Sequence, residues 1–198
     1  MPTIENSANN PKTKGEAARK RTSVSATIQP AHLVHAGREI PLDLGPSVRI
    51  ELLTSPNEED YWVMKGTLEP GASVPLHSHG DDEDFYVLSG RAEALVETTN
   101  GLEWKRVQAG DFIHIPGNMK HAWRNHFSTP AEKIIVTPAK LGRFFREMDE
   151  LIRAVGNNGT MEKLKDLSDR YGYWLGSPEE NAAVGISAVI SRSRSRTS

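Results

Sequence analysis

The chain has 198 residues, a net charge of −2 at neutral pH and no cysteine. This length suits one domain with a sizeable core and is too short for two ordinary domains. Without cysteine there are no disulfides and no thiolate ligands, so any metal site must use imidazole and carboxylate groups. The apolar runs are a few residues long, far below the roughly 20 that span a bilayer, so no membrane segment is expected.

Both ends of the sequence are polar and basic. Residues 1–28 contain five basic and two acidic residues, and the final SRSRSRTS contains three arginines, so the part between these ends carries a charge of −8. This composition predicts a disordered basic tail over 1–28 and a flexible tail over 176–198. The acidic middle argues against a nucleic-acid partner. No apolar stretch follows the first basic residues, so we expect no secretory signal and a cytoplasmic location.

The sequence from residue 29 to 138 is typical of a series of short β-strands. Segments 48–53 and 61–68 are rich in β-branched and aromatic residues and are separated by residues of turn and loop type. Pro70 presets φ and Gly71 accepts a positive φ, which suits a type II turn. Two strands and a chain reversal are therefore predicted.

A hairpin is predicted further along the chain. The dipeptide Asn100–Gly101 lies between strand-like segments 92–98 and 102–107 and is a strong turn signal. Further strands are expected at 112–115 and 133–137, which makes turns recur about every ten residues, as in a sandwich or barrel. The predicted fold class is mainly β.

After Pro138 the period changes from strand to helix, and 139–175 is predicted to be a C-terminal helical extension. A second helix is expected from Thr160 to about Tyr171. Two helices and a short turn also fit a helix-turn-helix, but the acidic residues on the second helix would repel phosphates, which favours packing on the barrel. The first helix is predicted from one apolar stripe, formed by Leu141, Phe144, Phe145, Met148, Leu151, Ile152 and Val155.

The stretch HSHGDDEDFYVLSG, residues 77–90, combines histidines and acids at strand spacing. Alternation along a strand puts His77 and His79 on the same face. A short turn then lets Glu83 enter the next strand, where it shares the inward face with Phe85 and Val87. One carboxylate is thereby expected to meet two imidazoles.

A third histidine begins a later strand. His121 follows a run of turn-forming residues, and Trp123 shares its face. Two questions stay open. His114 either lines the pocket or faces solvent, and Asp84 is the alternative to Glu83 as the acidic ligand. Asp81 and Asp82 are expected to be solvated loop residues.

Two motifs in this region resemble those of the cupin family. The first is G-x5-H-x-H-x3-E-x6-G over 71–90, and it agrees at every position. The second is G-x5-P-x-N-x2-H-x3-N over 110–125, with Asn118 where the family usually has glycine. Asparagine tolerates the left-handed conformation better than most residues, so this departure is mild. With the neighbouring strands the likeness extends over about 47–137.

The resemblance implies a double-stranded β-helix, or cupin jelly-roll barrel, with one divalent transition-metal ion held by His77, His79, Glu83 and His121. Imidazole and carboxylate ligands suit Fe, Mn, Ni, Co or Zn and do not choose among them. Such a set leaves coordination positions for water or substrate, which favours catalysis over a closed structural site.

The order of barrel and helices resembles bacterial proteins related to quercetin 2,3-dioxygenase. The first hypothesis is an oxidoreductase, namely a metal-dependent dioxygenase. It would use O₂ to oxidise a flavonol-like or other enolisable aromatic small molecule. Glu83 would be the catalytic base of this enzyme. Phe85, Val87 and Trp123 are its expected apolar pocket. The second hypothesis is a metal-dependent isomerase, cyclase or lyase, and the third is a non-catalytic ligand-binding cupin.

Three histidines lie outside the motifs, and we expect His32, His35 and His126 to be ordinary solvated residues. Cupins often pair barrels through strand exchange, and the segment from about His32 to Val48 is able to supply such a strand. A homodimer is therefore predicted.

Overall fold

The computed structural model describes residues 31–44, 48–155 and 160–186. The predicted tail over 1–28 lies outside these residues. From His32 onward the chain belongs to one compact unit. Within the described residues, no helix is both long and apolar enough to cross a membrane.

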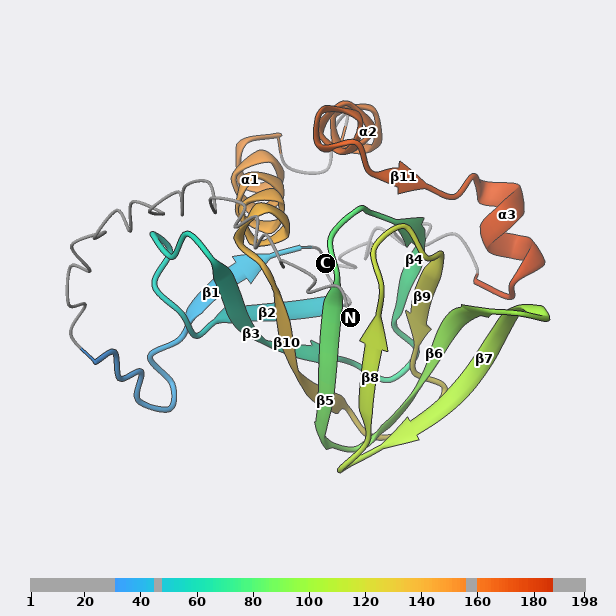
Figure 1. Ribbon diagram of the computed structural model, residues 1–198, viewed down its shortest axis with the longest axis horizontal. Helices are drawn as coiled ribbons and strands as arrows, with labels where there is room; N and C mark the ends of the chain where they lie inside the picture. The colour runs from blue at the N-terminus through green and yellow to red at the C-terminus, as the bar shows by residue number, and fades with distance from the viewer. Residues whose placement is uncertain (1–30, 45–47, 156–159, 187–198) are drawn as a thin grey trace, which may run out of the picture. The chain divides into compact units, whose positions relative to one another are not determined.

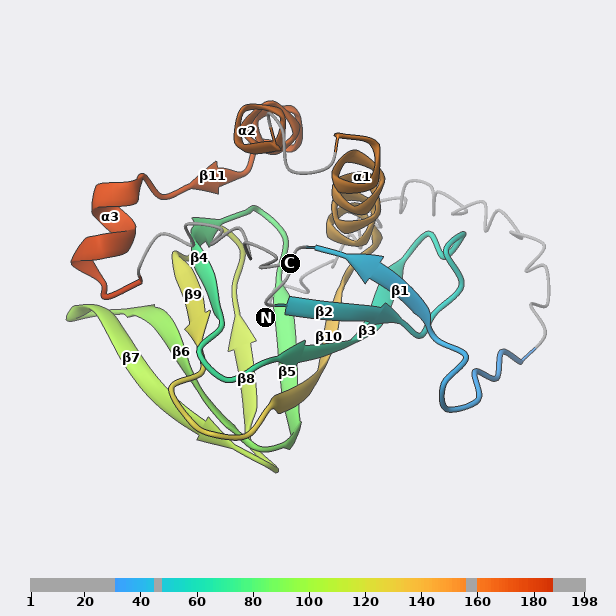
Figure 2. The same cartoon turned by 180° about the vertical axis from the view of Figure 1, so that it is seen from behind.

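The described strands form two antiparallel sheets (Figures 1 and 2). The first sheet has the order β1 (Ile40–Asp43), β2 (Val48–Leu52), β3 (Tyr61–Leu68), β10 (Ala131–Pro138), β5 (Glu83–Ser89) and β8 (Phe112–Ile115). The second has the order β11 (Trp174–Leu175), β4 (Ser73–Ser78), β9 (His121–Arg124), β6 (Arg91–Thr98) and β7 (Gly101–Gln108). The mainly β architecture predicted from the sequence is confirmed.

The core lies between the two sheets and follows the alternation of the strands. On β5, Glu83, Phe85 and Val87 are buried, while Tyr86 and Leu88 are exposed. This assigns the inward face as the sequence predicted, because successive strand residues point to opposite faces. On β3, the side chains of Trp62 and Met64 are fully buried in the core.

Two predicted turns are present, one with a shifted register. Gly71 has φ of 78°, and Ala72 N donates to Glu69 O at 3.0 Å, which is the predicted type II turn. In the β6–β7 hairpin Thr98 pairs with Gly101, so the loop residues are 99 and 100 rather than Asn100 and Gly101. The Thr98 hydroxyl accepts from Asn100 N and donates to Gly101 O, which fixes this tighter closure.

The helices α1 (Ala139–Val155), α2 (Thr160–Tyr171) and α3 (Pro178–Ala183) follow one another, with β11, across one end of the two sheets (Figure 1). Leu141 and Phe144 from the predicted stripe pack with Leu167 of α2 and with Tyr173. Burying this stripe between the helices removes apolar surface from water and holds the extension together.

The C-terminal segment departs from its prediction. A flexible tail was expected over 176–198, but α3 lies within it and begins with a capping box between Ser177 and Glu180. The buried Asn181 accepts a hydrogen bond from Leu76 N of β4 at 2.8 Å. The prediction does not hold for 176–186, because these polar residues satisfy backbone groups of the barrel instead of water. Residues 187–198 lie outside the described ones.

The strand that was expected to exchange between two subunits pairs within its own chain. β1 lies antiparallel to β2, with Ile40 opposite Leu52. Asp43 N of β1 also donates to Asp149 Oδ1 of α1 at 2.6 Å, which fastens the edge of the sheet to the helix. The homodimer stays a prediction.

Gly142 is expected to be intolerant of a side chain. Its position on α1 leaves so little room that a Cβ would lie 2.3–2.5 Å from ring atoms of Trp62. That ring is fully buried and donates to Glu58 O at 3.1 Å, so it cannot move aside. Gly142→Ala should lower the free energy of unfolding by about 2 kcal/mol despite the better helix propensity of alanine. Chemical denaturation measures this, and Glu150→Ala on the exposed face should change it little. Equal stability of Gly142→Ala and the native chain would contradict the tight packing.

Candidate metal centre

A bulge in β4 aims His77 into the barrel. Val74 pairs with Trp123 and His77 pairs with His121, so β4 has one more residue than β9 between these pairs. The extra residue changes the phase of the strand, and Val74 and His77 both face inward while Leu76 packs on the outer face. Bulges commonly re-aim side chains in this way beside functional sites.

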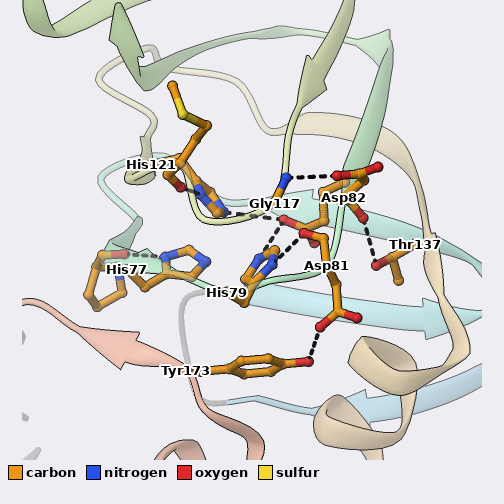
Figure 3. A network of polar contacts seen from close by, with 11 residues as sticks. His77, His79, Asp81, Asp82, Gly117, His121, Thr137 and Tyr173 are labelled. Carbon is orange, nitrogen blue, oxygen red and sulfur yellow. Dashed lines mark hydrogen bonds and ion pairs between the residues drawn. The ribbon is translucent and has the colours of Figure 1, made fainter.

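His77, His79, Glu83 and His121 come together at this end of the barrel, and their ligand atoms all lie within 4.8 Å of one another. The histidines among them are seen together in Figure 3. Glu83 Oε2 is 3.4 Å from His79 Nε2 and 3.3 Å from His121 Nε2. These three side chains are buried, and His77 is partly exposed. The structure thus brings together the four residues that the sequence placed in one set.

Backbone carbonyls fix the orientation of each imidazole. The Nδ1 atoms of His77, His79 and His121 lie 2.7, 2.8 and 2.9 Å from the carbonyl oxygens of residues 75, 81 and 119. A carbonyl only accepts, so each neutral ring carries its proton on Nδ1 and a lone pair on Nε2. The Nε2 atoms of His79 and His121 are buried without a hydrogen-bond partner. Three imidazole lone pairs and one carboxylate, two of the lone pairs without a hydrogen-bond partner among the described residues, make a donor set that fits a divalent metal ion.

The charge states of the cluster suit this donor set. Burial raises the pKa of Glu83, but His121 and His79 lower it by more, so its pKa lies well below the usual range and the carboxyl group is ionised. Burial and the neighbouring imidazoles lower the pKa of His77 to about 3. For His79, burial lowers the pKa, but Glu83 and Asp81 raise it by more. A carboxylate and a neutral His77 are the forms that metal binding requires.

Hydrogen bonds of Asp82 and Asn118 join the loops around the cluster. Asp82 accepts twice, from Gly117 N at 2.7 Å through its side chain and from the Thr137 hydroxyl at 3.1 Å through its carbonyl (Figure 3). Asn118 has φ of 68°, as its place in the motif predicted, and its N–H donates to His79 O at 2.6 Å. Asp82 is exposed in its loop, as expected, and it also joins the two ligand-bearing loops.

Comparisons with known proteins agree with this geometry. Residues 64–137, which include all four clustered side chains, match the family model of the cupin domain. Over these residues the barrel is of the cupin type. A similar fold occurs in the polyketide cyclase RemF from Streptomyces resistomycificus, with 17% identity, a TM-score of 0.50, and coverage of 56% of this chain and 80% of that one. At this identity the similarity shows the fold alone.

Two further solved structures are similar over part of the chain. KdgF from Halomonas sp. is 18% identical with a TM-score of 0.49, and the match covers 56% of this chain and 94% of KdgF. A mutant of oxalate decarboxylase OxdC from Bacillus subtilis is 26% identical with a TM-score of 0.42, and the match covers 46% of this chain and 26% of that enzyme. A comparison with curated protein sequences gives no match.

The C-terminal extension adds a residue to the cupin site that sequence reasoning missed. Tyr173 donates to Asp81 Oδ2 at 2.5 Å, and its ring centroid is 5.4 Å from that of His79 (Figure 3). Burial and the bond to Asp81 raise the pKa of Tyr173, so the phenol stays neutral. β11 then pairs with β4, placing Leu175 opposite His77. Asp81 is thus a structural acceptor and not a solvated loop residue. The aromatic residues within 171–174 were the sequence feature that could have indicated a segment packed against the site.

This covering segment is expected to depend on Asn181. Besides accepting from Leu76 N, its amide donates to Gly176 O and Ser177 O. Asn181→Ala removes these bonds and should cost roughly 1–3 kcal/mol. Hydrogen exchange should accelerate over 172–186 but not in β5 or β10 of the cupin barrel. Replacing the exposed Ala182 by Ser is the matched control. Unchanged exchange in Asn181→Ala would contradict its fastening role.

The predicted pocket residues lie on two different faces of the cupin barrel. Phe85, Val87 and Trp123 are buried on the inward face, with the Phe85 and Trp123 ring centroids 4.8 Å apart. His114 instead lies on the outer face of β8, where its Nδ1 is 2.7 Å from Asp84 Oδ1 and both side chains are substantially exposed. His114 is therefore not an interior pocket residue, and Asp84 is not in the metal cluster, because strand alternation turns this pair away from Glu83.

A cavity of about 180 Å³ opens between β6 and β8. Its inner wall includes Val96, which pairs with His121, and Ile115, which pairs with Glu83. Its outer wall includes His114 and Lys120. The cavity thus lies beside the cross-strand neighbours of two residues of the cluster.

One charged residue inside the cupin barrel was not anticipated. Lys133 of β10 is 7% exposed, and its Nζ lies 3.3 Å from the centroid of the Trp123 ring. Two other basic residues of the barrel strands are placed differently, since Lys65 pairs with Glu51 at 2.7 Å and Arg91 is exposed. Alternation along β10 was the signal that would have found Lys133.

Proposed function

We propose that this cupin is a metal-dependent enzyme whose His77, His79, Glu83 and His121 hold one divalent transition-metal ion. The observation that carries this proposal is the convergence of three imidazole Nε2 atoms on one ionised carboxylate, two of them buried without a partner. Leaving such groups unpaired in a folded protein is costly, and a cation satisfies them together.

The reaction proposed is oxidation of an enolisable aromatic small molecule of flavonol type by O₂. A bound ion of this class would supply Lewis acidity and, for the metals other than zinc, redox chemistry. Glu83 is buried, ionised and placed to accept the proton of a substrate hydroxyl group. Phe85 and Trp123 are buried beside the cluster and make its surroundings apolar, which suits an aromatic ring better than a sugar phosphate.

A non-oxidative reaction is the second candidate. The same base and the same ion suit an isomerase, cyclase or lyase, and the polyketide cyclase RemF shares the fold. A non-catalytic ligand-binding cupin is the third candidate, and the unpaired donor set supports it less. Fold similarity does not choose among these chemistries. A small-molecule partner is common to all three, and the cytoplasmic location stays a prediction.

Elemental analysis combined with an oxygen electrode tests the proposal. Protein supplied with Fe, Mn, Ni, Co or Zn should retain about one ion per chain after dialysis, and flavonols should be consumed together with O₂. Turnover of an enolisable substrate at an equal rate without O₂ would favour the second candidate. A protein that retains none of these metals would overturn the proposal.

A further inference from the structure

Lys133 lies deep in the barrel with no anionic partner in contact. β10 turns Ala131, Lys133, Ile135 and Thr137 inward, and all four are buried. Within the described part of the chain, the Nζ of Lys133 has no hydrogen bond and no ion pair; its neighbours are the rings of Trp123 and Phe85, with the Phe85 centroid at 5.0 Å. Glu83 acts on it only at longer range.

This amine is in an unfavourable environment for a lysine. Burial lowers the pKa of Lys133 to about 7, since a charged ammonium group loses its hydration there. Cation–π attraction to the faces of Trp123 and Phe85 offsets part of the lost hydration free energy. An apolar side chain of similar length would fill the same place without the loss, so packing does not account for a lysine here.

A second unpaired donor belongs to the same ring. Trp123 is 2% exposed, and its indole Nε1, which can only donate, is buried without a partner. Two donors on adjoining side chains, each residue more than nine-tenths buried, therefore lack an acceptor among the described residues. Such pairs are typical of sites that receive an anionic oxygen.

The position of this pair relates it to the proposed metal site. Trp123 follows His121 by two residues on β9, and Phe85 follows Glu83 by two residues on β5, so each ring takes the next inward place after a clustered side chain. Lys133, which lies over the Trp123 ring, is therefore on the same inward face as the cluster, on the far side of these rings from Glu83 and His121.

We infer that Lys133 and the indole N–H of Trp123 form an anion-binding subsite that receives a carboxylate or enolate oxygen of the substrate. The inference rests on the proposed function, because it assumes that the substrate reacts at the four clustered side chains. It deepens that function by naming the substrate class. The substrate is an aromatic anion with its charged oxygen remote from the clustered histidines. Lys133 is then a specificity-determining residue.

Calorimetric titration with benzoate and with its neutral analogue benzamide tests the subsite. The full-length protein is measured after metal removal and again with zinc, because an ion alone also attracts carboxylate. Native protein should bind benzoate at least 10-fold more tightly than benzamide in both forms. Lys133→Met should remove this preference while benzamide binding stays the same. Lys105→Met, at an exposed position on β7, is the control and should behave as native.

Further variants separate a ligand role from a structural one. Lys133→Met should unfold at the same temperature as native protein or higher, whereas a lysine needed for cation–π packing would make it unfold at a lower one. Trp123→Phe keeps a ring but loses the N–H, and should weaken benzoate binding about threefold or more. If Lys133→Met folds poorly, Lys133→Gln is used instead. Equal benzoate binding by native protein and the Lys133 variant, or no benzoate binding by native protein, would overturn the inference.

Failure of this inference is distinguishable from failure of the proposed function. If the protein retains metal and its benzoate binding does not depend on Lys133, only the anion-binding subsite is ruled out. A protein that retains no metal but discriminates benzoate from benzamide through Lys133 keeps the subsite and loses the metal-dependent reaction.

Discussion

Glu83→Gln is expected to lower turnover by about 10²–10⁴-fold at saturating metal, the range that general-base catalysis contributes. Glutamine keeps the size of the side chain and one carbonyl oxygen but accepts no proton at working pH. The native carboxyl group is buried and ionised, because the nearby His79 and His121 hold its pKa far below the usual range. Metal loading should fall only in part, since three imidazoles remain. Steady-state kinetics and elemental analysis on the same samples separate the two effects.

Asp84→Asn is the matched control for this change. Asp84 is the next residue on β5, but it faces outward and pairs with His114 on the exposed side of the sheet. The control should leave both turnover and metal loading nearly unchanged. Turnover near the native rate in metal-saturated Glu83→Gln, or strong damage in Asp84→Asn, would show that the acid has been assigned to the wrong residue.

His121→Ala is expected to weaken metal binding by about 100-fold or more, since loss of even an outer partner of a ligand typically costs 10–100-fold. His121 is 1% exposed, its Nε2 is buried without a partner, and its Nδ1 is held by Met119 O. The ring is therefore preorganised. Isothermal titration with Zn²⁺ or Ni²⁺ and elemental analysis after dialysis measure the change.

Two other histidines serve as controls for this loss. His32 is exposed, and His114 lies on the outer face of β8. Their replacement by alanine should leave the tight site intact. Native metal content in His121→Ala would mean that the second cupin motif has been misread.

Local sequence patterns determined much of the fold and most of the site. Alternation along β5 assigned Glu83 to the inward face, and the structure agrees because a strand has only two faces. The 3.6-residue period located the helices after Pro138. The spacing of His77, His79 and Glu83 predicted that one carboxylate meets two imidazoles, and the resemblance of the two motifs to those of cupins added His121. The alternation, the helical period and the first spacing each lie within one element and its adjoining turn.

The tertiary structure alone decided which polar groups are buried and by what. The bulge in β4 exists only against β9, and it sets the direction of His77. Tyr173 and Asn181 meet the barrel across about 100 residues of sequence, and their partners are backbone or loop groups that carry no residue-specific signal. In the sequence Lys133 is indistinguishable from a surface lysine, and only the folded chain brings it against the rings of Trp123 and Phe85. The cost of burying a charge depends on neighbours that folding brings together from other strands, so composition and period along one strand could not reveal it.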